Sequence, residues 1–186
     1  MTIEVVSLEI PDIKIIKTGK FGDSRGFFSE TYSRKSFQEA GIDISFVQDN
    51  HSRSALAGTI RGLHFQAPPF AQDKLVRVVK GCILDVAVDL RKSSPTFGKW
   101  VSAEISAENW QQMLIPAGFA HGFCTLEADT EVIYKVSQYY APQHDHGVAW
   151  NDPDLGITWP VTAAQATLSA KDMALPRLRD VATPFA

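Results

Sequence analysis

The sequence predicts an all-β fold, a sandwich or a barrel, with a few short helices at its periphery. Short segments rich in β-branched and aromatic residues recur along the chain, and many alternate apolar with polar residues. Glycine, proline and other turn residues separate these segments. The predicted strands are residues 13–17, 27–32, 45–52, 59–66, 74–79, 83–90, 100–105, 111–116 and 131–140.

Each predicted strand is justified by its own letters. In chain order the strands read IKIIK, FFSETY, SFVQDNHS, TIRGLHFQ, KLVRVV, ILDVAVDL, WVSAEI, QQMLIP and EVIYKVSQYY. Residues 33–41, SRKSFQEAG, are the best helix candidate, because Ser33 is suited to cap a helix and Gly41 to end it. KLVRVV and CILDVAVDL flank Lys80-Gly81, which predicts a β-hairpin with its turn there. The tail after Trp159 has weak helical signal.

Length and composition indicate one globular domain, and we expect it to span residues 1–186. Apolar residues make up 45% of the chain and charged residues 21%, which is enough apolar material for a sizeable core. The net charge of −3 argues against a nucleic-acid or membrane partner attracted by bulk charge, although a local basic pocket stays open. The start of the chain has no signal-peptide pattern, and no window approaches ~18 uninterrupted apolar residues, so we expect a cytoplasmic protein.

The two cysteines, Cys82 and Cys124, lie in apolar stretches. Two thiols cannot form a disulfide framework or complete a zinc site alone, so buried reduced thiols are expected.

His64, in TIRGLHFQ, is the first polar residue that does not fit a core strand. It is open to three interpretations: a structural histidine, a metal ligand or a general base. A metal site of the cupin type usually has two histidines alternating on one strand, but the flanking positions here are Gly62 and Gln66. His121 is suited to be a distant ligand, yet the strand partner is missing, which argues against a metal.

A general base needs a carboxylate to orient its ring. The sequence offers several candidates and does not choose among them: Asp49, Asp85, Asp89 and Asp172.

Other polar residues on the predicted strands have both a structural and a functional interpretation. Lys74 is either an exposed strand-start lysine or a cation at the mouth of a cavity. Tyr134 is either an aromatic core filler or a proton donor, and Tyr139 and Tyr140 are suited to stack on a flat base. Arg25 and Arg61 are either solvated or bind phosphate, for which the forked guanidinium is well suited.

Taken together, these segments resemble the dTDP-4-dehydrorhamnose 3,5-epimerase family. The matching motifs run in family order from about residue 21 to residue 172 and therefore cover most of the chain. They are DSRGFFSETY, FVQDNHSRS, IRGLHFQ, DKLVRVVKG, DVAVDLRKSSPTFGKW, LIPAGFAHGF, YKVSQYYAP, WNDPDLGITWP and LSAKD.

The resemblance implies a cupin-like jelly-roll barrel that acts as a homodimer without metal or organic cofactor. It implies a dTDP-sugar substrate, dTDP-4-dehydro-6-deoxy-D-glucose, whose carbons 3 and 5 are epimerised to give dTDP-4-dehydro-L-rhamnose. Both carbons flank a ketone, so loss of either hydrogen leaves a resonance-stabilised enolate. A base, an acid on the opposite face and a cation at the ketone oxygen are the groups required.

The resemblance also implies roles for individual residues. His64 is the base, Asp172 its carboxylate partner, Tyr134 the acid and Lys74 the cation near the ketone oxygen. The residues implied in substrate binding are Arg25, Phe28, Glu30, Gln48, Asn50, Arg61, His121, Tyr139 and Lys171. Phe28 and Tyr139 match positions that pack or stack on the thymine, Glu30 is a weaker match, and the segment around Arg25 often reaches the neighbouring subunit in this family.

Some positions depart from the family pattern. Phe65 stands where tyrosine is common, and this change should matter little. Gln143, His144 and Asp145 stand where EHERG is typical, so a family carboxylate near the nucleotide is open to replacement here and these positions receive no catalytic role. Two alternatives stay open: an enzyme that epimerises only carbon 3 or carbon 5, and a non-catalytic sugar-nucleotide-binding cupin. Arg61 and His64 have opposite strand parity, so a twist or bulge at Gly62 is needed for both to reach one ligand.

Overall fold

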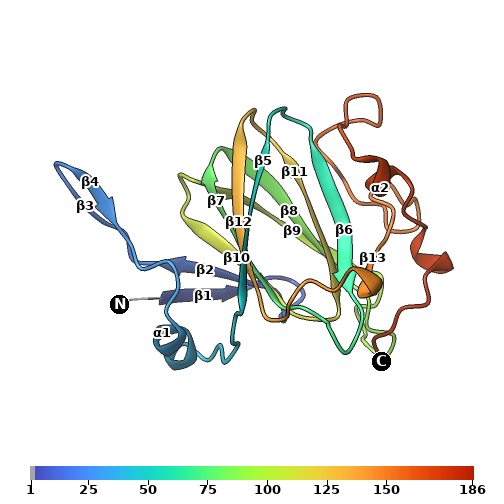
Figure 1. Ribbon diagram of the computed structural model, residues 1–186, viewed down its shortest axis with the longest axis horizontal. Helices are drawn as coiled ribbons and strands as arrows, with labels where there is room; N and C mark the ends of the chain where they lie inside the picture. The colour runs from blue at the N-terminus through green and yellow to red at the C-terminus, as the bar shows by residue number, and fades with distance from the viewer. Residues whose placement is uncertain (1–2) are drawn as a thin grey trace.

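Two antiparallel β-sheets pack face to face in the computed structural model, which describes residues 3–186 (Figure 1). The larger sheet has six strands, in the order β1-β2-β10-β7-β12-β5, and the smaller has five, in the order β13-β6-β11-β8-β9. The strands of the larger sheet are β1 (Ile3–Ser7), β2 (Lys14–Thr18), β10 (Gln111–Ile115), β7 (Lys74–Lys80), β12 (Thr130–Val136) and β5 (Gln48–Ser54). Those of the smaller sheet are β13 (Asp145–Gly147), β6 (Ile60–Gln66), β11 (Phe119–Thr125), β8 (Cys82–Asp89) and β9 (Trp100–Ser106). The predicted all-β jelly-roll barrel is confirmed.

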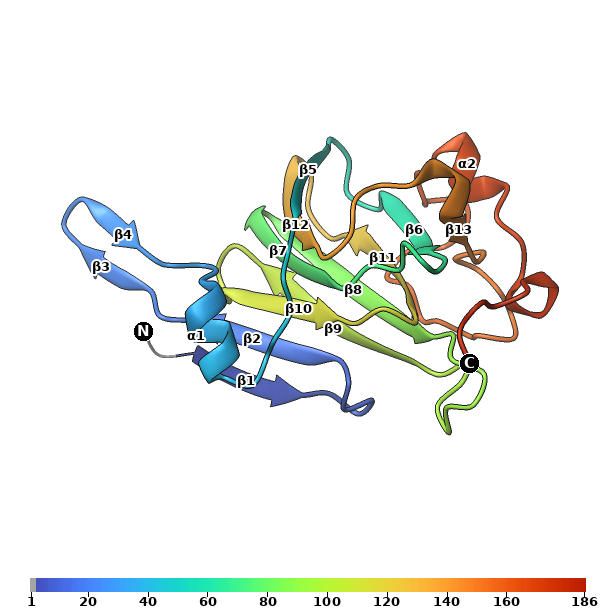
Figure 2. The same ribbon diagram turned by 60° about the horizontal axis from the view of Figure 1, so that its bottom comes forward.

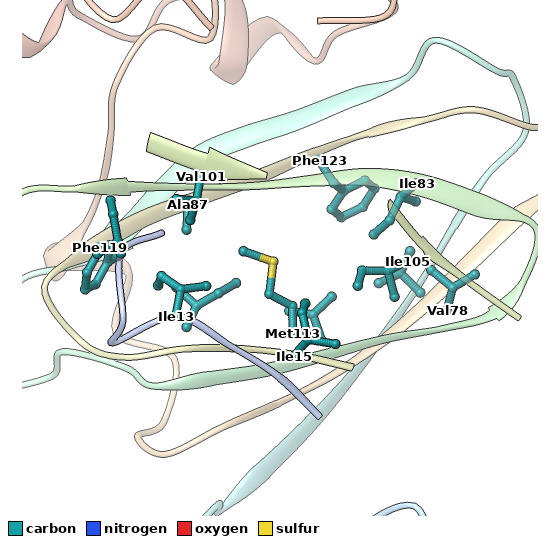
Figure 3. Packing of buried hydrophobic residues seen from close by; sticks show 14 residues of the cluster. Ile13, Ile15, Val78, Ile83, Ala87, Val101, Ile105, Met113, Phe119 and Phe123 are labelled. Carbon is teal, nitrogen blue, oxygen red and sulfur yellow. The ribbon is translucent and has the colours of Figure 1, made fainter. Parts of the chain in front are cut away.

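The main hydrophobic core fills the space between the two sheets (Figure 3). Met113 of the larger sheet and Ile83 and Ile105 of the smaller sheet are each 0% exposed. Side chains alternate between the two faces along a strand: Ile83 and Ala87 of β8 point into this core, whereas Val86 packs on the outside of the sheet. Every second side chain of a strand therefore points toward the facing sheet and packs in the main core.

The chain after β13 covers the outer face of the smaller sheet. Leu63 and Val86 are buried there against partly buried residues of this C-terminal segment, among them Ile157 and Leu178. The segment includes the short helix α2 (Ala170–Met173) and the 3₁₀ turn η2 (Leu178–Asp180), and another 3₁₀ turn, η1 (Pro142–His144), precedes β13. Figure 1 shows α2 beside β6, the strand of His64.

Helix α1 (Arg34–Glu39) covers the outer face of the larger sheet, where Phe37 is 1% exposed and packs with Ile16 and Leu114. The Ser33 hydroxyl accepts a hydrogen bond from the Ser36 backbone N–H, which caps the helix. Gly41 has a φ of +82° just past the helix end. The helix predicted over residues 33–41 is therefore confirmed, with both of its ends.

A two-stranded arm, residues 21–28, projects from the barrel. It consists of β3 (Phe21–Asp23) and β4 (Gly26–Phe28), and Figures 1 and 2 both show it extending beyond the sheets. Phe21, Phe27 and Phe28 are 56%, 56% and 67% exposed. Within this chain the arm is anchored near its base, where the Phe27 ring meets Trp110 edge-to-face at 4.9 Å between centroids.

The predicted hairpin at Lys80-Gly81 is wrong. β7 and β8 do not form a hairpin, because they belong to different sheets. Gly81, with a φ of +78°, turns the chain from one layer of the barrel to the other. Four strands were not predicted: β1, β3, β11 and β13. All residues of β11 are buried, because core covers both faces of the sheet at this point. A strand buried on both faces lacks the apolar–polar alternation that identifies strands in a sequence.

Two predicted strands are shorter in the structure than in the sequence analysis. β4 ends at Phe28, and β12 ends at Val136, so the tyrosines that follow β12 lie in an irregular segment. No helix in the described part of the chain is long and apolar enough to cross a membrane.

Candidate active site

A polar cavity of about 130 Å³ opens at one end of the barrel, between the two sheets. Five of the predicted site residues line it: Gln48 and Asn50 of β5, His64 of β6, Lys74 of β7 and Tyr134 of β12. They come from both sheets and are spread over 87 positions of the chain, so it is the pairing of the strands that brings them together.

The histidine of this cavity has a buried carboxylate partner. His64 Nε2 lies 2.6 Å from Asp172 Oδ1, and Asp172 is 5% exposed. A carboxylate can only accept, so the ring proton is on Nε2 and Nδ1 keeps a lone pair. Burial acts to raise the pKa of Asp172, but hydrogen bonds from His64 and Ser169 lower it, and the net pKa lies below the ordinary value.

Local helix geometry holds Asp172 in place. Ser169 caps α2, and its hydroxyl donates to Asp172 Oδ2 at 2.8 Å while accepting from the Asp172 backbone N–H at 3.1 Å. Both carboxylate oxygens of Asp172 are therefore hydrogen-bonded, which fixes the side chain against rotation.

The fold also decides among the four carboxylates that the sequence offered. Asp49 pairs with Lys135 on the outside of the larger sheet, at 2.8 Å. Asp89 accepts from Arg91, Ser94 and Thr96, and Asp85 pairs with His121. Only Asp172, of these four, contacts His64.

β6 carries a bulge at Gly62, as the parity argument predicted. His64 is paired with His121 of β11 and Arg61 with Phe123, so two residues of β6 oppose the single Gly122. Leu63 belongs to the outer hydrophobic cluster, while Arg61 and His64 lie on the inner side. Strict alternation would place Arg61 and Leu63 on one face, and this expectation is wrong because the bulge shifts the alternation by one residue.

Only glycine fits at the bulge. A Cβ on Gly62 would lie 2.6 Å from Gly122 Cα and 2.8 Å from the His121 carbonyl oxygen. The backbone of Gly62 also has a φ of +125°, which residues with a side chain rarely adopt. Arg61 is exposed at the edge of the site, where its guanidinium donates to Ser54 Oγ at 3.2 Å and to the Arg53 carbonyl at 3.0 Å.

Lys74 is the first residue of β7 and is buried, with 9% exposure. Its Nζ donates to the backbone carbonyl of His64 at 3.3 Å, which places the ammonium beside the histidine. Burial lowers the pKa of Lys74 to about 8, while the negative charges of Asp145 and Asp85 act to raise it. The lysine is therefore largely protonated at neutral pH although it is buried.

Tyr134 lines the cavity from the sheet opposite His64. Burial raises the pKa of its phenol, and the positive charge of Arg61 opposes that effect. The phenol therefore keeps its proton throughout the neutral range and is available as a donor.

His121 and Asp85 form a second histidine–carboxylate pair, with 2.6 Å between His121 Nε2 and Asp85 Oδ1. This pair is more deeply buried than the first: His121 is 7% exposed and Asp85 is 0% exposed. Burial lowers the pKa of His121, although Asp85 acts to raise it. The predicted binding residue His121 thus lies behind the cavity rather than in its lining.

An ion pair lies at the cavity mouth, between the predicted residue Lys171 and Asp145, for which the sequence indicated no role. Asp145 lines the cavity, and Lys171 Nζ lies 2.5 Å from Asp145 Oδ2. The Tyr140 hydroxyl donates to the same oxygen at 3.1 Å. Burial lowers the pKa of Lys171, but the hydrogen bond to Asp145 raises it, and the net pKa lies above the ordinary value. Lys171, predicted from the resemblance, therefore lies at the mouth in an ion pair.

Four predicted residues lie elsewhere in this chain. Arg25 and Phe28 are on the projecting arm, and Arg25 pairs with Asp23 at 2.5 Å. Glu30 accepts from Ser36 Oγ at 3.2 Å near α1. Tyr139 is 63% exposed, and its backbone carbonyl accepts from Gln66 Nε2. The fold of a single chain does not bring these four side chains into the cavity lining.

The remaining lining residues were not named as site residues: Phe65, Gln66, Gln72, Tyr140 and Asp145. Gln66 shares strand parity with His64, which is a signal that the sequence did contain. Asp145 follows the turn η1, and nothing in its neighbourhood in the sequence indicates that it faces a cavity. Among residues 3–186, no three His, Cys, Asp or Glu side chains gather as metal ligands.

Known proteins resemble this chain over nearly its whole length. The family model described as dTDP-4-dehydrorhamnose 3,5-epimerase matches residues 7–180. A dTDP-4-dehydrorhamnose 3,5-epimerase of Sinorhizobium fredii is 53% identical over 179 residues, covering 96% of this chain and 91% of that protein.

Solved structures agree with this match. The dTDP-4-dehydrorhamnose 3,5-epimerase of Bacillus anthracis, with TDP and PPi bound, is 53% identical with a TM-score of 0.91, covering 95% of this chain and 99% of that one. The dTDP-6-deoxy-D-glucose-3,5-epimerase of Legionella pneumophila, in complex with dTDP-4-keto-L-rhamnose, is 43% identical with a TM-score of 0.94, covering 100% and 99%. This chain therefore belongs to the dTDP-4-dehydrorhamnose 3,5-epimerase family.

Proposed function

We propose that this protein epimerises dTDP-4-dehydro-6-deoxy-D-glucose at carbons 3 and 5 to give dTDP-4-dehydro-L-rhamnose, a step of dTDP-L-rhamnose biosynthesis. The observation that carries the proposal is the His64–Asp172 pair at 2.6 Å in a cavity that Tyr134 lines from the opposite sheet. Family membership supports the substrate, because the relatives named above bear this activity in their names.

The base in this mechanism is His64. Asp172 holds the proton on Nε2, so the lone pair of Nδ1 accepts the hydrogen from the carbon beside the ketone. The imidazolium that forms is then stabilised by the carboxylate, as in other histidine–aspartate pairs. Because both carbons flank the same ketone, one base is sufficient for carbon 3 and carbon 5 in turn.

The acid and the enolate stabiliser complete the site. Tyr134 returns a proton from the opposite side of the sugar ring, which inverts the carbon, and its raised pKa keeps the proton available. Lys74 supplies a positive charge for the ketone oxygen, where negative charge develops as the enolate forms. Gln48 and Asn50 line the same cavity and hydrogen-bond the sugar. The proposal includes no metal and no organic cofactor.

The diphosphate is bound at the mouth of the cavity, where Arg61 and Lys171 supply positive charge. His121 supports the site from behind through its position next to His64 on β11. Tyr139, exposed beside the mouth, is available to stack on the thymine.

The arm completes the site of a second copy of the chain in this proposal. Arg25 and Phe28 project away from their own cavity, and the three exposed phenylalanines of the arm make it unsuited to remain in water. In a homodimer the arm of one protomer brings Arg25, Phe28 and Glu30 to the nucleotide end of its partner's cavity. We also propose that residues 1–186 form one domain, of which residues 1 and 2 lie outside the described residues, and that the protein works in the cytoplasm.

The deciding experiment is incubation with the 4-keto sugar nucleotide in heavy water, followed by NMR of the sugar. We expect deuterium at both carbon 3 and carbon 5, and loss of both signals in a His64→Asn variant. A chelator should leave the rate unchanged, and inactivation reversed by added metal would contradict the metal-free mechanism.

The same spectra test the two alternatives. Deuterium at one carbon only would indicate a single-position epimerase. Binding of dTDP without any exchange, by the wild-type protein, would indicate a non-catalytic sugar-nucleotide-binding protein.

A further inference from the structure

The inner face of the smaller sheet carries a row of polar side chains at one end of an otherwise apolar core. His64 of β6, His121 of β11 and Asp85 of β8 follow one another across three neighbouring strands. Asp85 is the deepest of them: it lies on β8 between Ile83 and Ala87, which both belong to the main hydrophobic core.

Only one of the two carboxylate oxygens of Asp85 has a hydrogen-bond partner among the described residues. Its Oδ1 is bound by His121 Nε2, but its Oδ2 is buried and has no hydrogen-bond partner among residues 3–186. A fully buried carboxylate with an unpaired oxygen is unfavourable, because burial removes the hydration of its charge. Such a group persists in a core only where a nearby positive charge or a functional need offsets that penalty.

A buried positive charge lies on the facing sheet, at Lys74 of β7. Lys74 of β7 is buried with its Nζ on the His64 carbonyl oxygen, so its ammonium has two further hydrogens without a partner among the described residues. Asp85 is one of two carboxylates whose charge raises the pKa of Lys74; the other, Asp145, lies at the cavity mouth and is already paired with Lys171. Asp85, by contrast, is hydrogen-bonded only to His121 among the described residues.

We propose that Asp85 is a positioning residue of the active site, whose fixed negative charge keeps the buried Lys74 in its ammonium form. It also holds the His121 ring in place through the Nε2–H hydrogen bond. This inference rests on the proposed function, since it gives Lys74 the charge that the enolate requires.

Several charged or titratable groups face Lys74 from the surrounding elements, and their effects oppose one another. Burial lowers the pKa of His121 and favours its neutral form, and burial raises the pKa of Tyr134, which keeps its proton. His64 donates from Nε2 to Asp172. Lys171 lowers the pKa of Lys74 and Asp145 raises it, and these two residues form an ion pair with each other. Asp85 has no cationic hydrogen-bond partner of its own, so its charge acts on Lys74 without such an offset.

The test measures the titration of Lys74 directly. Protein carrying ¹³Cε-lysine is titrated by NMR between about pH 6 and pH 11, and the Lys74 signal is assigned by its absence in Lys74→Arg. In Asp85→Asn, which keeps the shape and a hydrogen bond to His121 but removes the charge, we expect the Lys74 midpoint to fall by about one pH unit. Asp154→Asn is the control, because that carboxylate is 58% exposed and remote, and it should leave the midpoint unchanged.

Enzyme kinetics provide the second readout. In Asp85→Asn the alkaline fall of kcat should move to lower pH together with the Lys74 midpoint, while KM changes little. An unmoved Lys74 midpoint would overturn the proposal, and would show that Asp85 is protonated or too far away. A lower kcat with an unshifted pH profile would also overturn it, and would leave Asp85 a purely structural role.

Two further measurements test the proposal if the Asp85→Asn variant does not fold. If Asp85→Asn does not fold, Asp85→Ser makes room for water at the same position and is titrated in its place. The wild-type protein is informative without any substitution, because a Lys74 that titrates below about pH 7 would contradict the proposal. The NMR titration needs no substrate, so absence of epimerase activity with a shifted midpoint would refute the proposed function and not the charge relationship.

Discussion

His64 and Asp172 are 108 positions apart in the chain, yet Nε2 of the histidine lies 2.6 Å from Oδ1 of the aspartate. The histidine is on β6, whereas the aspartate belongs to the short C-terminal helix α2, which lies beside that strand. The covering segment therefore does more than shield the sheet from water: it supplies the carboxylate that sets the tautomer of the base.

The first prediction concerns this carboxylate. Asp172→Asn can donate from its amide, so it no longer requires the proton on His64 Nε2 and removes the charge that stabilises the imidazolium. We expect kcat to fall on the order of 10²–10⁴-fold with little change in the folded structure. Steady-state kinetics with circular dichroism check this, and Asp180→Asn, whose side chain is 63% exposed, is the control. Near-normal activity of Asp172→Asn would rule out this role for Asp172.

The second prediction separates proton removal from proton return. Tyr134→Phe retains the ring but loses the hydroxyl, so His64 can still remove hydrogen while the opposite face lacks its donor. We expect net inversion to fall at least about 10²-fold, and deuterium exchange at the two carbons to fall less. NMR in heavy water measures both in one sample. Tyr32→Phe is the matched control, because Tyr32 packs against Phe37 and Phe46 on the outside of the larger sheet. Equal loss of exchange and inversion would contradict the assignment of Tyr134 as the acid.

The third prediction is that the buried positive charge of Lys74 lowers the free energy of unfolding, although catalysis requires that charge. Its pKa is about 8 in the folded protein against 10.5 ordinarily, a difference that corresponds to about 3 kcal/mol. Because the folded state binds the proton more weakly, the free energy of unfolding should rise as the pH increases from about 8 to about 10.5.

Lys74→Met should therefore increase the free energy of unfolding at pH 7 by up to about 3 kcal/mol, and the gain should shrink above pH 10. It should also lower kcat on the order of 10²–10³-fold, because the enolate loses its cation. Urea unfolding at several pH values tests the first part. A variant less stable than the wild type at pH 7 would contradict the argument, and the exposed Lys35→Met, whose side chain is 86% exposed, is the control.

The fourth prediction concerns the bulge in β6. Gly62→Ala places a Cβ 2.6 Å from the Gly122 backbone at a φ of +125°, so the two strands must separate. We expect a loss of about 2–4 kcal/mol in the free energy of unfolding, together with a marked loss of activity because Arg61 and His64 both move. Gly156→Ala also has a positive φ, but nothing lies within 4 Å of its Cβ, so it isolates the backbone strain. Equal effects of the two variants would show that the close strand contact is unimportant.

The fifth prediction tests the arm. Arg25→Ala and His64→Asn should each be nearly inactive alone. In a mixed dimer, the protomer with intact His64 receives an intact Arg25 from its partner, so refolding an equal mixture should restore roughly a quarter of the wild-type sites. If the arm serves its own chain, the mixture stays inactive. Size-exclusion chromatography with light scattering confirms that the samples are dimers.

The sequence on its own determined much of this protein. Alternating β-branched segments predicted strands such as β7 and β12, and Ser33 and Gly41 predicted the limits of α1, because these signals depend on neighbours along the chain. The parity of Arg61 and His64 indicated that a twist or bulge at Gly62 is needed for both to reach one ligand, and the bulge is present. The ordered motifs further identified the family, which nominated His64, Lys74, Tyr134 and Asp172.

Tertiary structure decided what local signals cannot contain. The turn at Gly81 has the sequence of a hairpin turn, because the same residue types form hairpins and turns between sheets. Only the pairing of β7 with β10 and β12, rather than with β8, shows that no hairpin forms here. β11 has no alternation because both of its faces are buried. Choosing Asp172 for His64 and Asp85 for His121 required the packing of α2 and β8 against these strands. Contacts between segments far apart in the chain set the two histidine–aspartate distances, and neither composition nor residue spacing predicts such contacts.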